Sequence, residues 1–148
     1  MTAKPTLFWE DVEVGMEIPP LHKRTSHMQL VKYAGAEEDW AEFHVNDAYA
    51  KSIGLPGAID HGLIKAAFLG QLLTDWIGVE GSLRKLDCQY RRMTLPGDPM
   101  VCRGKVVNKY VQDGEHCVEL EIWTENSMGE VTTPGHATVV LPTRSKSV

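Results

Sequence analysis

The chain of 148 residues has the length of one ordinary domain, and its 43% hydrophobic and 24% charged residues are typical of a globular protein. Its formal net charge of −5 argues against nucleic acid as a partner, because nucleic-acid-binding domains usually carry a basic excess. No uncharged apolar stretch reaches the roughly 18 residues of a membrane helix, and the N-terminus lacks the apolar core of a secretory signal. We therefore expect a cytoplasmic protein with one domain over residues 1–148 and a flexible tail, "TRSKSV", from residue 143.

The first half of the chain shows signals for a short strand and two short helices. Residues 21–25 can form the strand. Ser26, followed three residues later by Gln29, has the capping-box form of a helix start, and Gly35 can end that helix. Asn46 can cap a second helix in "DAYAKSI", which the glycine and proline that follow it terminate.

The longest helix is predicted for "HGLIKAAFLGQLLTDWI", which starts at His61 and is followed by Gly78. Its apolar residues cover most of the circumference of a helix. Such a helix is buried on most sides, so we expect it at the centre of the domain.

The second half of the chain is predicted to form four strands. Each stretch alternates with a period of two, and the turn signals "PGD", "QDGE" and "NSMGE" separate them. Four consecutive strands with short links predict an antiparallel meander, to which residues 21–25 add a fifth strand. The expected fold class is α+β, with a curved antiparallel sheet of about five strands wrapped around the long central helix. The four strands are expected at residues 82–95, 99–112, 115–126 and 129–142.

Three cysteines, Cys88, Cys102 and Cys117, are far apart in the sequence and form no C-x-x-C pair. An odd number without a secretion signal favours reduced thiols. A zinc site made with His116 is the alternative, but adjacent residues on a strand point to opposite faces. We interpret the cysteines as small buried residues on strands.

Asp39 and His44 lie in "EEDWAEFHV", between the two predicted short helices. Trp40 and Phe43 indicate that this loop folds against the domain, which would partly desolvate both polar groups. A carboxylate and an imidazole together can hold a water molecule, remove its proton and return a proton elsewhere. The alternative is that both are ordinary polar residues of a surface loop, since this spacing is common by chance.

His61 and Gly62 stand where the long helix begins. The N–H of Gly62 has no intrahelical acceptor and lies at the positive end of the helix dipole. Such a donor suits an oxygen that becomes negative during a reaction, and glycine also lets a ligand approach closely. A simple helix start explains the same two residues.

Read together, "EDWAEFH", "VNDAYAKSIGLPGAID" and "HG" resemble the active-site motif of the MaoC-like (R)-specific enoyl-CoA hydratase and acyl dehydratase family. In that motif G-D-x-N-P-x-H precedes a short helix and then H-G. "FWEDVEVGMEI" resembles the usual opening of the family and "PGDPMVCRGKV" its sheet segment, so the resemblance covers nearly the whole chain. It implies a hot-dog fold, which agrees with the arrangement expected above, and a homodimer or higher oligomer with the substrate tunnel near the interface.

The resemblance also implies an activity, the reversible addition of water to a trans-2-enoyl thioester to give a (3R)-3-hydroxyacyl thioester. Asp39 and His44 match the catalytic acid–base pair of the family, and Gly62 matches the residue whose N–H holds the thioester oxygen. His61 is expected to orient the loop and not to react. Neither a metal nor a cofactor is expected, because coenzyme A or phosphopantetheine enters as part of the substrate.

One departure from the motif concerns the space between the acid and the histidine. The family asparagine, whose amide helps to hold the catalytic water, is Ala41 here, and the proline that follows it is Glu42. Losing one positioning hydrogen bond costs about 0.5–1.5 kcal/mol when water can substitute, so we expect reduced hydratase activity and not its loss. Glu42 is expected to face solvent.

Basic residues outnumber acids over residues 84–109, which suits the phosphates of coenzyme A or of a carrier's phosphopantetheine. Arg91 and Arg92 are the candidates for this contact, because neighbours on a strand face opposite ways and one of them could reach the site. The alternative is that these basic residues form the solvated face of the strands.

Two other functions are compatible with the sequence. A thioesterase on the same fold would use Asp39 to activate water against the thioester carbonyl, and Ala41 weakens the preference for a hydratase over it. An acyl-binding partner subunit of a heteromeric dehydratase would be expected to lack the acid–base pair, which this chain keeps.

Overall fold

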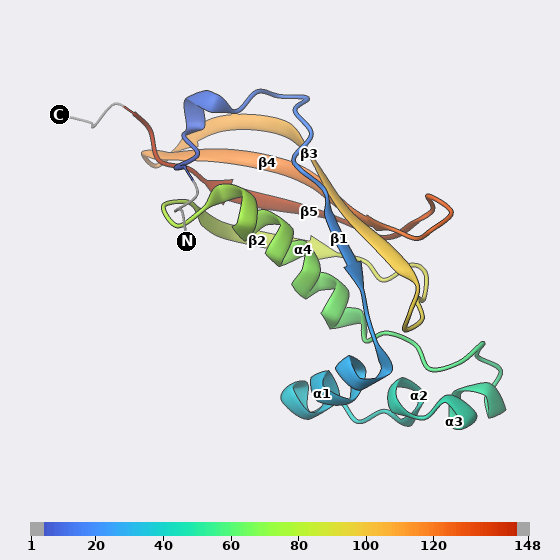
Figure 1. Cartoon of the computed structure of the whole chain (residues 1–148). Helices are drawn as coiled ribbons and strands as arrows, with labels where there is room; N and C mark the ends of the chain where they lie inside the picture. The colour runs from blue at the N-terminus through green and yellow to red at the C-terminus, as the bar shows by residue number, and fades with distance from the viewer. Residues whose placement is uncertain (1–4, 145–148) are drawn as a thin grey trace.

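A five-stranded antiparallel sheet curls over one long helix (Figure 1). This computed structural model describes residues 5–144, so the tail expected from residue 143 lies largely outside the described residues. Within them, Arg144 forms an ion pair with Asp11. The elements in chain order are the 3-10 turn η1 (Trp9–Asp11), β1 (Leu21–Arg24), α1 (His27–Glu37), α2 (Glu42–Val45), α3 (Asp47–Ser52), α4 (Gly62–Ile77), β2 (Ser82–Cys88), β3 (Pro99–Gln112), β4 (Glu115–Glu125) and β5 (Val131–Val140).

The strand order, β1-β3-β4-β5-β2, differs from the predicted four-strand meander. β3, β4 and β5 are consecutive neighbours as predicted, but β2 pairs with β5 at one edge of the sheet, and β1 pairs with β3 at the other. β2 also ends at Cys88, well before the predicted residue 95. The prediction assumed that a short link joins strands lying side by side. Residues 89–98 form instead an irregular link that leads from the β2 edge to β3.

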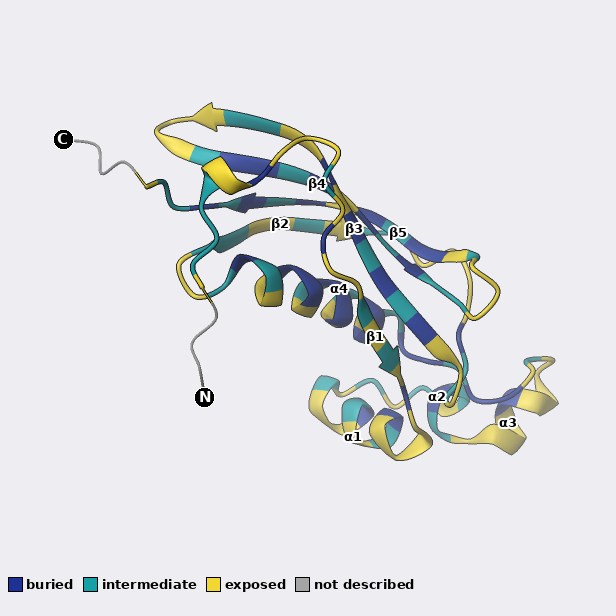
Figure 2. Ribbon diagram, turned by 45° about the horizontal axis from the view of Figure 1, so that its top comes forward, coloured by how far each residue is buried: buried dark blue, intermediate teal, exposed yellow. Residues whose placement is uncertain are grey.

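Helix α4 packs one face against the concave side of the sheet and leaves a stripe exposed, as Figure 2 shows. The prediction that it is buried on most sides is therefore wrong for the stripe of Leu63, Ala67, Gln71 and Thr74. Each fully buried leucine or isoleucine stabilises the fold by roughly 1.5–3 kcal/mol relative to an exposed one. The residues of α4 that supply this burial are Ile64, Phe68, Leu69, Leu72, Leu73 and Ile77.

The short helices begin where their caps predict. The Ser26 hydroxyl accepts the N–H of Gln29 at 3.1 Å, and the Asn46 side chain accepts the N–H of Tyr49 at 3.1 Å. Gly35, however, does not end α1, which continues to Glu37 and stops at a residue with a positive φ. The Trp40 ring packs against Gly35, 3.4 Å from where a Cβ would stand, which is about van der Waals contact.

The cysteines lie on three different strands, with Cys102 and Cys117 buried and Cys88 half-buried. Burial raises the pKa of Cys102 to about 12, so this thiol stays protonated. His116 packs edge-on against the Trp9 ring, on the opposite side of β4 from the buried Cys117. Among the described residues, no helix is both long and apolar enough to cross a bilayer.

A buried carboxylate fixes the point at which α4 begins. Asp60 accepts the hydroxyl of Thr25 at 2.7 Å and that of Thr94 at 2.9 Å, and its own N–H donates to the carbonyl of Thr94 at 2.8 Å. Thr25 follows β1, and Thr94 belongs to the link of residues 89–98. Three segments distant in the sequence therefore meet directly before His61 and Gly62.

Thr25→Val should destabilise the fold by about 1–3 kcal/mol, because it leaves one oxygen of the buried Asp60 carboxylate without its donor. Thr133→Val is the matched control, since the Thr133 hydroxyl is also buried but has no hydrogen-bond partner among the described residues. That change should be neutral or stabilising. Urea unfolding of both variants measures the difference, and equal effects would contradict this role for Thr25.

The stability of the protein should depend on pH through Asp60. Burial raises the pKa of this carboxyl above its ordinary value, although the hydroxyls of Thr25 and Thr94 and the nearby Lys65 ammonium act against this. Between the ordinary and the raised pKa the folded protein holds a proton that the unfolded chain has lost, so this contribution to stability falls as pH rises through that window.

Asp60→Asn removes this titration. The free energy of unfolding of the wild type minus that of Asp60→Asn should therefore decrease from about pH 3.8 upward and level off above the raised pKa. Urea unfolding of both proteins at successive pH values from acid to neutral provides the comparison. A difference that increases with pH would show that the pKa of Asp60 is lowered, so that the hydrogen bonds affect it more than burial does.

Candidate active site

Asp39 and His44 face each other beside the first turn of α4. Asp39 lies in the loop after α1, and His44 lies in the four-residue helix α2, which replaces the continuous loop predicted here. Their side chains approach to 3.8 Å between the Asp39 Oδ2 and His44 Nε2 atoms. The His44 side chain is almost fully buried, whereas that of Asp39 is 44% exposed. The structure thus brings the predicted pair together, with one member in contact with solvent.

The main chain determines which nitrogen of His44 carries a proton. Its Nδ1 lies 2.7 Å from the carbonyl oxygen of Ile59, and a carbonyl can only accept. Nδ1 is therefore the protonated nitrogen, and in the neutral ring Nε2 presents a lone pair on the side of Asp39. Both Nε2 and Oδ2 can accept a hydrogen bond across the 3.8 Å between them.

His61 contacts both members of this pair. Its ring stacks on that of His44, with centroids 3.9 Å apart and planes 18° from parallel, and Tyr33 packs edge-on against it. The His61 Nε2 atom lies 3.2 Å from the carbonyl oxygen of Asp39, to which it donates. The Nδ1 atom is buried and has no partner among the described residues. His61 therefore holds the backbone of the loop that carries Asp39.

Asp39, His44 and His61 each offer one atom that could bind a metal ion, and these atoms lie within 4.8 Å of one another. Two imidazoles that share an ion direct their in-plane lone pairs at it. Because the two rings stack nearly parallel, their lone pairs lie in nearly parallel planes and do not converge on one ion. The arrangement favours a hydrogen-bonded water molecule over a coordinated ion.

Gly62 is the first residue of α4, so its N–H lies free of intrahelical hydrogen bonds at the positive end of the helix. The ring of Tyr90 packs directly on this residue, because a Cβ added to Gly62 would stand 2.8 Å from the Tyr90 Cδ2 atom. The sequence predicted that the absent side chain admits a ligand. In the structure, the Tyr90 ring occupies the space where a side chain of Gly62 would stand.

Ala41 and Glu42 occupy the positions where this chain departs from the hydratase motif. The N–H of Ala41 donates to the Asp39 Oδ1 atom at 3.2 Å, so the backbone at this position contacts the acid although the side chain cannot. Glu42 is exposed, and its carboxylate accepts the side-chain amide of Asn46. As expected, it faces solvent.

Arg91 and Arg92 lie in the irregular link and not on a strand. The prediction that they face opposite ways as neighbours on a strand is therefore wrong. The guanidinium of Arg91 donates to the Gln89 side chain, and that of Arg92 lies 3.7 Å from the carboxylate of Glu130. Neither contact involves Asp39 or His44.

Two residues near the site were missed by the sequence reasoning. Lys65 is buried in α4, and Tyr90 lies over Gly62. A lysine among the apolar residues of the first half of α4 was a signal that could have been followed. Nothing in the sequence places Tyr90, because its position depends on where the link of residues 89–98 crosses the start of α4.

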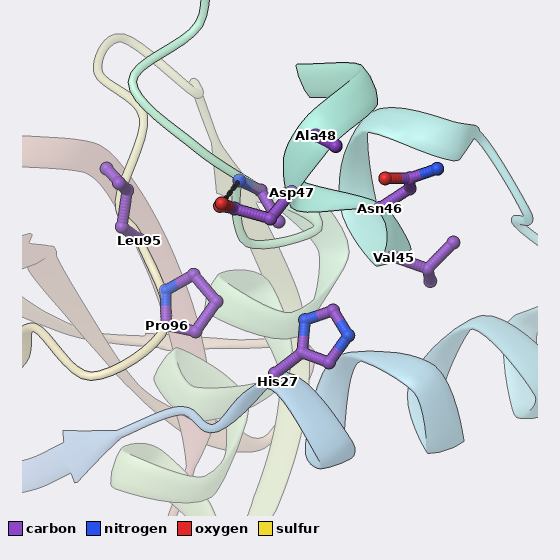
Figure 3. Close-up of a pocket in the computed structure, with 8 residues that line it drawn as sticks. His27, Val45, Asn46, Asp47, Ala48, Leu95 and Pro96 are labelled. Carbon is purple, nitrogen blue, oxygen red and sulfur yellow. Dashed lines mark hydrogen bonds between the residues drawn. The ribbon is translucent and has the colours of Figure 1, made fainter. Parts of the chain in front are cut away.

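A hollow of about 630 Å³ lies beside α3, where Asp47 accepts the N–H of Ala58 at 3.1 Å (Figure 3). Three other hollows of about 270 to 700 Å³ lie elsewhere on the surface. None of these four is lined by Asp39, His44 or Gly62. The Tyr90 ring packs on Gly62 on the side where a Cβ would stand. The residues that line the hollow beside α3 are His27, Val45, Asn46, Asp47, Ala48, Ala58, Leu95 and Pro96.

Comparison with known proteins agrees with this fold. The (R)-hydratase of A. caviae involved in PHA biosynthesis superposes with a TM-score of 0.81 at 22% identity, over 90% of this chain and 99% of that one. A chain of the ChsH1-ChsH2 complex from Mycobacterium tuberculosis superposes with a TM-score of 0.76 at 19% identity, over 87% of this chain and 98% of that one. At these identities the two structures establish the fold alone.

The curated relatives are much longer proteins. Fatty acid synthase subunit beta of Saccharomyces cerevisiae is 27% identical over 112 residues, which are 74% of this chain but 5% of the relative. This chain thus spans about a twentieth of that protein. The model of the "MaoC like domain" family matches residues 12–127, most of the chain. The chain therefore belongs to the MaoC-like domain family and has its hot-dog fold.

Proposed function

We propose that the protein adds water reversibly to a trans-2-enoyl thioester and forms a (3R)-3-hydroxyacyl thioester. Family membership supports hydration or dehydration of acyl thioesters as the general activity. The observation that carries the finer proposal is the 3.8 Å approach of Asp39 to the unprotonated nitrogen of His44, beside the start of α4.

The two acceptors suit one water molecule. A water oxygen about 2.8 Å from each can donate one hydrogen to Asp39 Oδ2 and the other to His44 Nε2. Its lone pairs are then directed away from both residues, toward the β-carbon of a bound enoyl group. The geometry supports removal of one proton from this water as its oxygen attacks, and return of a proton to the α-carbon on the same face.

Charge builds on the thioester oxygen in the enolate that this attack produces. The free N–H of Gly62 is a preorganised donor at the positive end of a 16-residue helix, which suits this charge. Ala41 supplies no side-chain hydrogen bond to the water, but its N–H holds the Asp39 carboxylate. We therefore propose that the missing asparagine lowers the rate of hydration and does not change the type of reaction.

Recognition of coenzyme A or of phosphopantetheine needs a cation for the phosphate. The ion pair of Arg92 and Glu130 is largely exposed, and such pairs contribute about 0–1 kcal/mol, so phosphate can replace the carboxylate at little cost. We keep Arg92 and Arg91 as the candidates for this contact. A homodimer is also part of the proposal, since β1 and β2 each leave one sheet edge open within the described chain.

Asp39→Asn and His44→Ala should each lower kcat for a trans-2-enoyl-CoA by about 10²–10⁴-fold, the usual contribution of a general acid or base. Loss of the enoyl absorbance measures hydration, and a thiol reagent in a parallel assay measures hydrolysis. Free thiol release with an unchanged double bond would instead identify a thioesterase. Thermal unfolding establishes whether each variant is folded. If His44→Ala does not fold, Asp39→Asn alone tests the assignment.

Asp87 and His136 provide a matched control, because their exposed side chains form another Asp–His pair, 3.5 Å apart, on strands β2 and β5. Asp87→Asn and His136→Ala should leave turnover unchanged. Near-normal rates in both Asp39→Asn and His44→Ala would overturn the assignment.

A further inference from the structure

Lys65 is an unusual residue for the inside of this domain. It lies in the first turn of α4 and is 2% exposed, although an ammonium group is costly to bury unless it is paired or hydrogen-bonded. Its Nζ atom donates to the carbonyl oxygen of Arg92 at 2.8 Å, and the Asp60 carboxylate attracts it. Burial lowers the pKa of Lys65, and Asp60 opposes this. The proposed reaction makes no use of this charge.

Lys65 and Asp60 stand on either side of His61 and Gly62 in the sequence, and both hold the link of residues 89–98. The Asp60 carboxylate accepts a hydrogen bond from the Thr94 hydroxyl, and the Asp60 N–H donates to the Thr94 carbonyl. The Lys65 ammonium donates to the carbonyl of Arg92. The start of α4 is thus tied to two nearby points of the link.

The other side of the same link is attached to β5. The N–H groups of Arg91 and Arg92 both donate to the carbonyl of Thr132, and that of Gln89 donates to the carbonyl of Pro134. Arg92 is therefore held from both sides, by the sheet through its N–H and by Lys65 through its carbonyl.

This link carries Tyr90, whose ring packs on Gly62. Tyr90 is 48% exposed, so burial alone does not keep the ring in place. Its position depends on the backbone that carries it and on the hydrogen bond between its hydroxyl and Cys88. The centre of the ring lies 5.8 Å from the Lys65 Nζ atom. A ring in this place also borders the N–H that we assign to the thioester oxygen.

We infer that Lys65 is a positioning residue, which holds the backbone of the link so that the Tyr90 ring stays on Gly62 as one wall of the thioester site. The catalytic consequence rests on the proposed function, because it requires the Gly62 N–H to bind the thioester oxygen. The α-carbon of the substrate is bonded to the thioester carbonyl, so this wall also limits the space for a substituent on the α-carbon.

Lys65→Met tests the inference, because it keeps the length of the side chain and removes its hydrogen bond and charge. Amide hydrogen exchange over residues 89–94 should accelerate at least about 10-fold, the signature of a local opening. With a straight-chain enoyl-CoA, kcat should fall about 10–100-fold while KM changes little, as expected when a catalytic donor is misaligned. Discrimination against a 2-methyl-enoyl-CoA should decrease.

Lys109→Met is the matched control. Its Nζ atom also donates to main-chain carbonyls, those of Trp9 and Val12, and lies over the Trp9 ring, but it anchors the N-terminal segment to β3. The variant should lose thermal stability and keep wild-type kcat, KM and substrate preference. A purely structural role for Lys65 would give the same pattern for Lys65→Met.

The inference is overturned if Lys65→Met keeps wild-type exchange over residues 89–94, or if the exchange accelerates and both kinetic constants stay unchanged. If Lys65→Met does not fold, the double variant Asp60→Asn/Lys65→Met removes both buried charges. It is then compared in the same measurements with Asp60→Asn alone, because Asp60 also holds the link through Thr94. If the wild type turns over no enoyl thioester, the proposed function fails, and the exchange experiment still decides whether Lys65 holds the link.

Discussion

The carboxylate of Asp60 is the contact on which the geometry of the site depends. A buried carboxylate is costly, and this one is offset by two hydroxyl donors and a nearby ammonium group. In return, the end of β1, the link after β2 and the first turn of α4 are held at one point. His61 and Gly62 follow directly, so their positions are set by packing and hydrogen bonds of the whole domain and not by the loop in which they lie.

The orientation of the histidines also comes from the main chain. In a serine protease triad a carboxylate orients the imidazole through its second nitrogen. Here the carbonyl of Ile59 does this for His44, and the carboxylate of Asp39 stands near the other nitrogen. The acid is therefore left free to hold a water molecule. His61 completes the arrangement, because it stacks on His44 and hydrogen-bonds the backbone of Asp39.

Local signals in the sequence were sufficient for much of the fold. Ser26 and Asn46 act as the caps they were predicted to be, and α4 ends directly before Gly78. The pairing of Asp39 with His44 was expected from the resemblance to the motif, since their spacing alone is common by chance. The features that were missed depend on long-range contacts. β2 stops at Cys88 and is followed by an irregular link. Tyr90 lies on Gly62 because this link crosses the start of α4, which no local pattern reveals.

The contact between Tyr90 and Gly62 affects how this glycine can be studied. An alanine at this position would collide with the aromatic ring even if the N–H took no part in the reaction. Loss of activity in such a variant would therefore not distinguish chemistry from packing. Evidence for the oxyanion donor must come from changes to the substrate, such as a thioester whose oxygen is a weaker acceptor, and not from changes to this residue.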